Sequence, residues 1–320
     1  MIRPAKFPSR TYRTWIMDSR RWADFRPRPD DIVIATYPKS GTTWMQRIVS
    51  LLVFQSAAHL PLWRISPWLE RRYPEPLKAV LARLEAQTHR RFIKTHLPPD
   101  GLPLFPQARY LHVARDGRDA CLSYHHHLTG FSREALEALD REGLADPTIG
   151  GPYPEIPADP ATYFRMWLSQ GIAPGHPDGS PALSWFATER QWWELRGQPN
   201  LLFVHYADLK ADLAGEMRRV AGFLDIEVDE QRWPELVDAA SFAAMRRDGP
   251  AFLGEAARMW AAGSDHFFAQ GRGRRWPGVL TPDDLARYAA KVAGELPADA
   301  AHWLAHGRLG ADGAGPLFPA

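Results

Sequence analysis

The chain has 320 residues, of which 45% are hydrophobic and 24% charged, so it can bury a core of the size that an α/β domain requires. Its formal net charge of +2 argues against a nucleic-acid-binding protein. A lone cysteine, the absence of an apolar run long enough for a membrane span, and a basic segment 1–15 without the apolar core of a secretory signal together predict a cytoplasmic protein.

Four short apolar runs predict strands. The first, residues 31–36, is rich in β-branched residues, and apolar side chains at helical spacing follow from Thr42. Further strands are expected at 91–95, 109–114 and 201–205, with Asp116 capping the helix after the third strand and a helix at 211–224 after the fourth. Strands that alternate with helices predict one α/β domain over 1–320, with a central parallel β-sheet flanked by helices.

Residues 131–184 differ in composition from the rest of the chain, since runs such as GGPYPEIPADP are rich in proline and glycine. We expect a long irregular insertion here, which either lines a binding site or is a surface loop without function. The glycine- and alanine-rich tail, 305–320, is expected to be loosely ordered. Most of the 13 tryptophans are expected to pack in the core.

The segment TYPKSGTTW, residues 36–44, joins the first strand to its helix and predicts an anion site. Backbone N–H groups and the partial positive charge of the helix N-terminus meet there, and Gly41 lets the backbone approach a ligand closely. Lys39 supplies a full charge, while Thr42 and Thr43 supply hydroxyl donors. The segment is not a Walker A loop, because the lysine precedes the glycine.

The second and third strands bring further polar residues to the same edge of the predicted sheet. Lys94 and His96 are two residues apart and therefore share a face at the carboxyl end of their strand, where ligands bind in open α/β sheets. Histidine can take a proton from a hydroxyl group near neutral pH. Arg115, at the end of the third strand, can bind a phosphate through two hydrogen bonds, and Ser123 follows two helical turns later.

Together these segments resemble the cytosolic-type sulfotransferases, which use 3′-phosphoadenosine 5′-phosphosulfate (PAPS) and release 3′-phosphoadenosine 5′-phosphate (PAP). TYPKSGTTW resembles their 5′-phosphosulfate loop, KTHLP their catalytic strand, and Arg115 with Ser123 eight residues later their 3′-phosphate motif. The resemblance covers roughly residues 20–295. It implies a P-loop-like nucleotide-binding scaffold and transfer of a sulfuryl group from PAPS to a hydroxyl or amine of a small-molecule acceptor (EC 2.8.2 type).

The same resemblance implies a role for each matching residue. His96 is the implied general base, assisted by Lys39 and Lys94, and the acceptor is expected to be apolar because of the tryptophans and the insertion. The implied nucleotide-binding residues are Lys39, Ser40, Gly41, Thr42, Thr43, Trp44, Arg115, Ser123, Tyr206, Phe242, Gly271 and Arg272.

Near the C-terminus the chain departs from the family pattern. The Arg-Lys pair that helps to hold the 3′-phosphate is missing from residues 269–277, and Arg272, Arg274 or Arg275 is expected to replace it, with Arg272 favoured. The short dimer motif of the family is also broken, by Pro277, Thr281-Pro282 and Ala286, which leaves the oligomeric state open. The acceptor, whether phenol, alcohol, steroid, lipid, amine or peptide, is open too.

Neither a metal nor a redox cofactor is expected, because the two lysines can stabilise the charge that Mg²⁺ stabilises in kinases. The consecutive His125, His126 and His127 point in different directions on a helix and so predict no shared metal site. Arg118 and Asp119 are expected to form a surface ion pair. Two alternatives remain: a Mg²⁺-dependent phosphotransferase, which requires a lysine after the glycine, and a nucleotide-binding module without activity.

Overall fold

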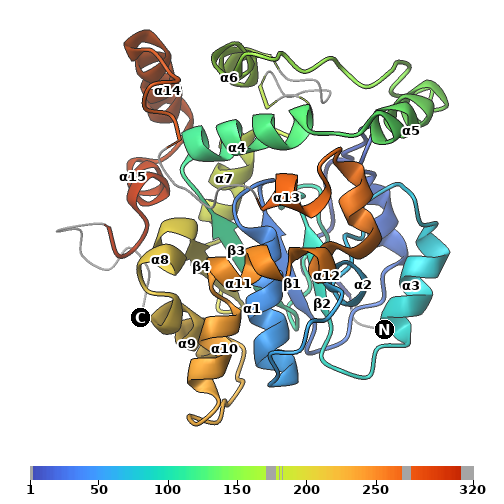
Figure 1. Ribbon diagram of the computed structural model, residues 1–320, viewed down its shortest axis with the longest axis vertical. Coiled ribbons are helices and arrows are strands. Elements are labelled where there is room, and N and C mark those ends of the chain that lie inside the picture. The colour runs from blue at the N-terminus through green and yellow to red at the C-terminus, as the bar shows by residue number, and fades with distance from the viewer. Residues whose placement is uncertain (1–2, 171–177, 180, 182, 269–274, 311–320) are drawn as a thin grey trace.

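A parallel sheet in the order β2-β1-β3-β4 forms the centre of the molecule (Figure 1). The structure is a computed structural model, and it describes residues 3–170, 178–179, 181, 183–268 and 275–310. Its strands are β1 (Ile32–Thr36), β2 (Phe92–Thr95), β3 (Arg109–Ala114) and β4 (Leu201–His205). All four coincide with predicted strands to within one residue at either end. The prediction of an α/β domain with a central parallel sheet is therefore confirmed.

The register of the strands aligns their carboxyl ends at one edge of the sheet. Ala35 of β1 pairs with Thr95 of β2, and Ala114 of β3 pairs with His205 of β4. The residues that directly follow the strands therefore leave the sheet on the same side, which is the side where open α/β folds bind ligands.

Helices surround the sheet (Figure 1). Helix α1 packs against β1 and β2, α9 packs against β4, and α4 crosses the end of the sheet with α6 on its far side. In chain order the helices are η1 (Ser19–Asp24, 3-10), α1 (Thr42–Phe54), α2 (Leu62–Ile65), α3 (Leu77–Glu85), α4 (Gly117–Thr129), α5 (Arg133–Leu144), α6 (Pro160–Ser169), α7 (Trp185–Glu194), α8 (Tyr206–Ala211), α9 (Leu213–Phe223), α10 (Trp233–Ala239), α11 (Phe242–Arg247), α12 (Gly249–Leu253), η2 (Gly254–Met259, 3-10), α13 (Gly263–Phe267), α14 (Pro282–Glu295) and α15 (Ala298–His306).

The segment 131–184 is more regular than its composition predicted, because it contains α5 and α6. Each helix begins at a side chain that caps it: the Ser132 hydroxyl accepts from the Ala135 N–H, and the Asp159 carboxylate accepts from the Thr162 N–H. Pro160 at the first position of α6 is compatible with a helix start. The proline-rich runs that indicated irregular chain therefore flank these two helices.

The helix expected at 211–224 is α9, which agrees with the prediction to within two residues, and a short helix that was not predicted, α8, precedes it. Helix α8 begins at Tyr206, where the His205 ring accepts from the Ala207 N–H. Asp212 leaves the helical conformation (φ −144°, ψ 80°), ends α8 and caps α9 through the Gly215 N–H.

Most of the tryptophans are buried in the core, as predicted, and some line a cavity. Six are almost wholly buried, namely Trp22, Trp167, Trp185, Trp192, Trp193 and Trp303. Trp44, Trp63, Trp68 and Trp260 line the large cavity described below. None of the helices in the described ranges is long and apolar enough to cross a membrane. Of the tail predicted to be loosely ordered, residues 311–320 lie outside the described residues, and 305–306 belong to α15.

Candidate active site

The loop between β1 and α1 has the backbone of an anion cradle. Lys39 and Gly41 both have positive φ, 69° and 112°, so the chain turns sharply before α1. Gly41 is the N-cap of α1 and provides no side-chain cap for the first N–H groups of the helix. A Cβ at Gly41 would lie 3.1 Å from the Tyr206 ring. Only glycine fits this conformation without strain, and the uncapped helix N-terminus is suited to a phosphate or sulfate.

This loop opens onto a cavity of about 810 Å³. Most of the predicted site residues line it together, although they come from six separate segments of the chain: Lys39, Gly41, Thr42, Thr43, Trp44, Lys94, His96, Arg115, Ser123, Tyr206 and Phe242. Ser40 is wholly buried and is not among the lining residues. Gly271 and Arg272, as well as Arg274, lie outside the described residues.

His96 is held in one orientation and one tautomer. Its Nδ1 lies 2.9 Å from the Thr36 carbonyl oxygen, which can only accept, so Nδ1 carries the proton. Nε2 is therefore the basic nitrogen, and it has no hydrogen-bond partner within the described ranges. Burial, and then the nearby Lys94 ammonium, lower the pKa of His96 well below its ordinary value. The imidazole is thus neutral at pH 7 and able to accept a proton.

Glu70, a residue that the sequence did not indicate, fixes the end of β2. Its buried carboxylate accepts from the His96 backbone N–H at 2.7 Å, from the Thr95 hydroxyl at 2.9 Å and from the Trp22 indole at 2.9 Å. The Trp68 ring meets the His96 ring edge-on, with centroids 4.9 Å apart. These contacts make His96 a rigid part of the cavity wall.

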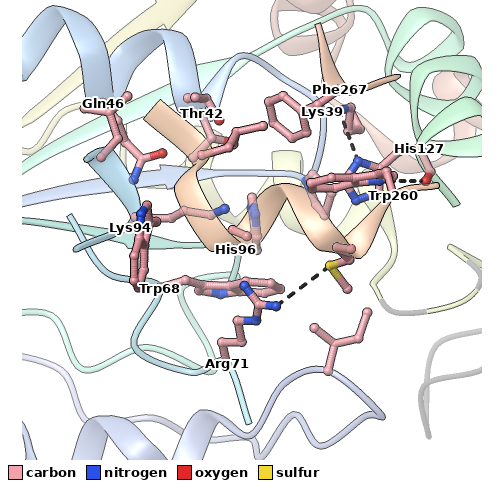
Figure 2. A pocket seen from close by; sticks show the side chains of 18 of the residues that line it. Lys39, Thr42, Gln46, Trp68, Arg71, Lys94, His96, His127, Trp260 and Phe267 are labelled. Carbon is pink, nitrogen blue, oxygen red and sulfur yellow. Dashed lines mark hydrogen bonds between the residues drawn. The ribbon is translucent and has the colours of Figure 1, made fainter. Parts of the chain in front are cut away.

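Two lysines place positive charge beside His96 (Figure 2). Lys39 Nζ lies 3.3 Å from His127 Nδ1 and 4.3 Å from the Phe267 ring centroid, while Lys94 Nζ lies 4.8 Å from that of Trp68. Neither lysine forms an ion pair with any residue that the structure describes. Burial lowers the pKa of Lys39 to about 7, with further contributions from Arg115 and other cations, and that of Lys94 to about 8. Such uncompensated cations favour a bound anion.

The far end of the cavity combines guanidinium groups with aromatic rings. Arg115 lies with its guanidinium carbon 4.4 Å from the Tyr206 ring centroid, and it donates to the Lys39 carbonyl oxygen at 3.2 Å. Trp44 meets the Tyr206 ring edge-on at 5.4 Å. Burial and the nearby Arg115 lower the pKa of Arg275, which also lines the cavity. Two guanidinium groups beside aromatic rings can bind a phosphate attached to a purine nucleoside.

The anchoring of Arg275 corrects one prediction. Asp119 does not form the expected ion pair with Arg118; its carboxylate accepts the Arg275 backbone N–H at 2.7 Å. Arg118 instead donates to Asp116 at 3.0 Å, and Asp116 caps α4 as predicted. Asp116, the N-cap of α4, accepts from both the backbone and the side chain of Arg118, whereas Asp119, in the first turn, is buried and accepts the Arg275 N–H.

The three consecutive histidines point to three different places, as helix geometry requires. His125 donates to the Pro157 carbonyl oxygen at 2.8 Å, the His126 ring stacks on His266 with centroids 4.0 Å apart, and His127 contacts Lys39. Over the described ranges, no group of three His, Cys, Asp or Glu side chains is arranged to hold a metal ion.

A comparison with known protein families supports the reading of this geometry. The family model described as "Sulfotransferase domain" matches residues 29–298. The chain belongs to the sulfotransferase family. It is a PAPS-dependent sulfotransferase, and this family match decides against the phosphotransferase alternative. That alternative also requires a Walker A lysine, which the loop between β1 and α1 lacks.

Relatives of this sulfotransferase match along most of its length. It is 35% identical over 318 residues to a glycolipid sulfotransferase of Mycobacterium bovis, covering 94% of this chain and 95% of that protein. Human sulfotransferase 1C2 is 30% identical over 231 residues, covering 70% of this chain and 68% of the human protein. The family and enzyme class predicted from the motifs are therefore confirmed.

Solved structures share the fold of this sulfotransferase. A mouse sulfotransferase, SULT7A1, complexed with PAP matches with a TM-score of 0.63 at 20% identity, covering 88% of this chain and 91% of the mouse chain. Retinol dehydratase in complex with androsterone and PAP matches with a TM-score of 0.66 at 22% identity, covering 88% and 87% of the two chains.

Proposed function

We propose that this sulfotransferase transfers the sulfuryl group of PAPS to a hydroxyl or amine of a small, largely apolar acceptor, with His96 as general base and PAP as the leaving product. The observation that carries the proposal is the tautomer of His96. Because Nδ1 donates to the Thr36 carbonyl, the basic Nε2 is left for the acceptor, in the same cavity as two lysines.

His96 Nε2 takes the proton of the acceptor hydroxyl as the acceptor oxygen forms a bond to sulfur. The bond from sulfur to the bridging phosphate oxygen breaks in the same step, and its electron pair stays on PAP. Lys39 and Lys94 stabilise the negative charge that develops on the sulfuryl and bridging oxygens. PAPS itself supplies the activated sulfuryl group, so the protein acts by positioning, electrostatics and one proton transfer.

The nucleotide is proposed to lie between the loop and the aromatic end of the cavity. The uncapped N-terminus of α1, with Thr42 and Thr43, is suited to the 5′-phosphate. Arg115 and Ser123 are proposed to hold the 3′-phosphate, as are Arg275 and the sequence-based candidate Arg272. The rings of Trp44, Tyr206 and Phe242 are proposed to hold the adenine. The arrangement of Arg115 beside Arg275 supports a ligand with a second phosphate.

The acceptor is proposed to occupy the other arm of the cavity, beyond His96. Apolar side chains from five separate segments line it, including Leu62, Trp63, Trp68, Phe131, Ala135, Phe252, Leu253, Met259 and Trp260. Phe131 and Ala135 belong to the segment 131–184, which supports the expectation that this insertion contributes to acceptor binding. The name of the mycobacterial relatives, glycolipid sulfotransferases, also supports an acceptor with an apolar part.

Replacement of His96 tests the proposal. His96→Ala should lower kcat about 100-fold or more, the usual scale for a lost general base, while the Kd of PAP stays within a few-fold of wild type. Turnover can be followed as transfer of labelled sulfate from PAPS to 2-naphthol or to any acceptor found in a screen. Thr36→Val is the control: it removes the hydroxyl that contacts His96 Nδ1 and the Thr42 hydroxyl but leaves the carbonyl that orients His96, so kcat should fall much less than in His96→Ala. Near-normal turnover of His96→Ala would exclude His96 as the base.

A further inference from the structure

Arg71 lines the cavity beside the proposed acceptor site, and its guanidinium forms no ion pair with the residues that the structure describes. Figure 2 shows its side chain reaching toward Trp68 and His96. Its Nη2 contacts the Met259 sulfur at 3.8 Å, a weak acceptor, and its Nε is buried with no hydrogen-bond partner. Among the residues that the structure describes, no carboxylate lies within ion-pair distance of Arg71.

The carboxylates that could pair with Arg71 already have other partners. Glu70, next to Arg71 in the chain, accepts from the His96 N–H. Glu75 and Glu142, which line the same cavity, pair with other arginines. Glu75 accepts two hydrogen bonds from Arg83, at 2.5 and 2.9 Å, and Glu142 pairs with Arg72 at 3.2 Å.

Burial lowers the pKa of the Arg71 guanidinium below its ordinary value. The Tyr73 side chain, with its ring centroid 5.4 Å from the guanidinium carbon, and the Glu75 carboxylate raise this pKa in part, but neither forms an ion pair with Arg71. A partly desolvated cation left in this state is unfavourable unless a ligand neutralises it.

The proposed nucleotide does not supply that anion. Lys39, beside the phosphosulfate loop, lies on the opposite side of His96 from Arg71 (Figure 2). The phosphates of PAPS are expected near Lys39, the loop and Arg115, and its sulfuryl group near Lys39 and Lys94. Arg71 lies close enough to Lys94 to lower the pKa of that lysine, but on the side away from Lys39, so we infer that its partner arrives with the acceptor.

We propose that Arg71 is a specificity residue that binds an oxyanion of the acceptor, so that the preferred acceptor is an apolar molecule with an acidic group in addition to the group that is sulfated. This inference rests on the proposed function, since it assumes that the acceptor enters beyond His96. A guanidinium can hold a carboxylate, sulfonate or phosphate through two parallel hydrogen bonds, which a lysine cannot reproduce.

A purely structural role for Arg71 makes a different prediction. Its backbone lies opposite Met17 in an isolated antiparallel bridge and donates to the Trp68 carbonyl oxygen at 3.2 Å. Loss of a structural side chain would weaken the binding of all acceptors alike, whereas loss of an oxyanion site would weaken the binding of acidic acceptors only. The ratio of affinities for an acidic and a neutral acceptor of the same shape therefore separates the two roles.

The test uses the full chain saturated with PAP, which binds acceptors without turnover. Calorimetry measures the Kd of 6-hydroxy-2-naphthoate, 6-hydroxynaphthalene-2-sulfonate and the neutral 6-hydroxy-2-naphthamide for wild type, Arg71→Met and Arg71→Lys. Arg258→Met is the matched control, because Arg258 also lines the cavity but is exposed to solvent.

Wild type should bind the carboxylate or the sulfonate about 10- to 100-fold more tightly than the amide, the range for a charge-assisted hydrogen bond. Arg71→Met should abolish this preference, Arg71→Lys should retain part of it, and Arg258→Met should leave it within about twofold. Equal binding of amide and anions by wild type, or an unchanged preference in Arg71→Met, would overturn the inference. If the amide still binds tightly in those cases, the proposed apolar acceptor arm stands and only the oxyanion site is refuted.

Discussion

Binding of PAP at pH 8 should draw protons from solution, because the two lysines beside His96 are partly neutral before the ligand arrives. Burial and neighbouring cations lower the pKa of Lys39 to about 7 and that of Lys94 to about 8. PAP brings phosphate charges into the same cavity and favours the charged form of both lysines, which moves each pKa upward. Protons are then taken up at every pH between the free and the bound pKa of each group.

The size of the effect follows from these two values. At pH 8 about a tenth of Lys39 and about half of Lys94 carry the proton in the free enzyme, so full protonation in the complex takes up about 1.4 protons. At pH 9.5 the uptake should rise toward about two protons, provided that both bound pKa values return to the ordinary range of lysine. The phosphates of PAP are fully ionised at pH 8 and release few protons that would mask the uptake.

The assay is calorimetric titration of PAP in two buffers of different ionisation enthalpy, from which the number of protons taken up is obtained directly. Replacement of Lys39 by methionine removes the larger contribution and should reduce the uptake to about half a proton. Uptake near zero in wild type would refute the reasoning, as would an unchanged uptake in Lys39→Met. Either result would mean that the lysines are already charged in the free enzyme or do not meet the nucleotide.

Three further substitutions test the rest of the site. Arg115→Ala should weaken the binding of PAP about 10- to 100-fold and that of adenosine 5′-phosphate much less. Equal losses of affinity for the two ligands would contradict a role of Arg115 in binding the 3′-phosphate. Glu70→Gln should lower the free energy of unfolding by about 1–3 kcal/mol and reduce kcat while the Kd of PAP is kept; wild-type kcat would show that His96 does not depend on this carboxylate. Gly41→Ala forces a side chain into φ 112° and toward the Tyr206 ring, so PAP binding should weaken and stability should fall by about 1–3 kcal/mol. Calorimetry with PAP and denaturant unfolding measure both effects, and an alanine variant with wild-type values would show that the loop is not constrained.

Features that depend on neighbours in the chain were predictable from the sequence. A strand requires only a short run of β-branched and apolar residues, and all four strands were located in this way. The anion-binding loop from Thr36 to Trp44 was predictable in the same way, because consecutive residues encode a turn, a positive charge and the start of a helix. The parallel arrangement then followed, and with it the meeting of Lys39, His96 and Arg115 at one edge of the sheet.

Helix boundaries in less regular segments depended on single capping side chains. Composition predicted irregular chain over 131–184, yet Ser132 and Asp159 begin helices there. Helix α8, which begins where the His205 ring accepts from the Ala207 N–H, was likewise not predicted. Composition is an average over several residues, so it does not reveal a helix start that depends on one capping hydrogen bond.

What remained hidden from the sequence are contacts between residues that lie far apart along the chain. The carboxylate of Glu70 meets the His96 backbone across 26 residues, His127 meets Lys39 across 88, and Asp119 anchors Arg275 across 156. No local pattern marks such residues, because their role depends on which side chains the packing of the helices on the sheet brings opposite them. By itself the sequence determined the family and the edge of the sheet at which its motifs meet. The tertiary structure decided which groups orient His96, which cations form no ion pair within the described residues and which side chains line the cavity around them, because these features depend on packing between distant segments.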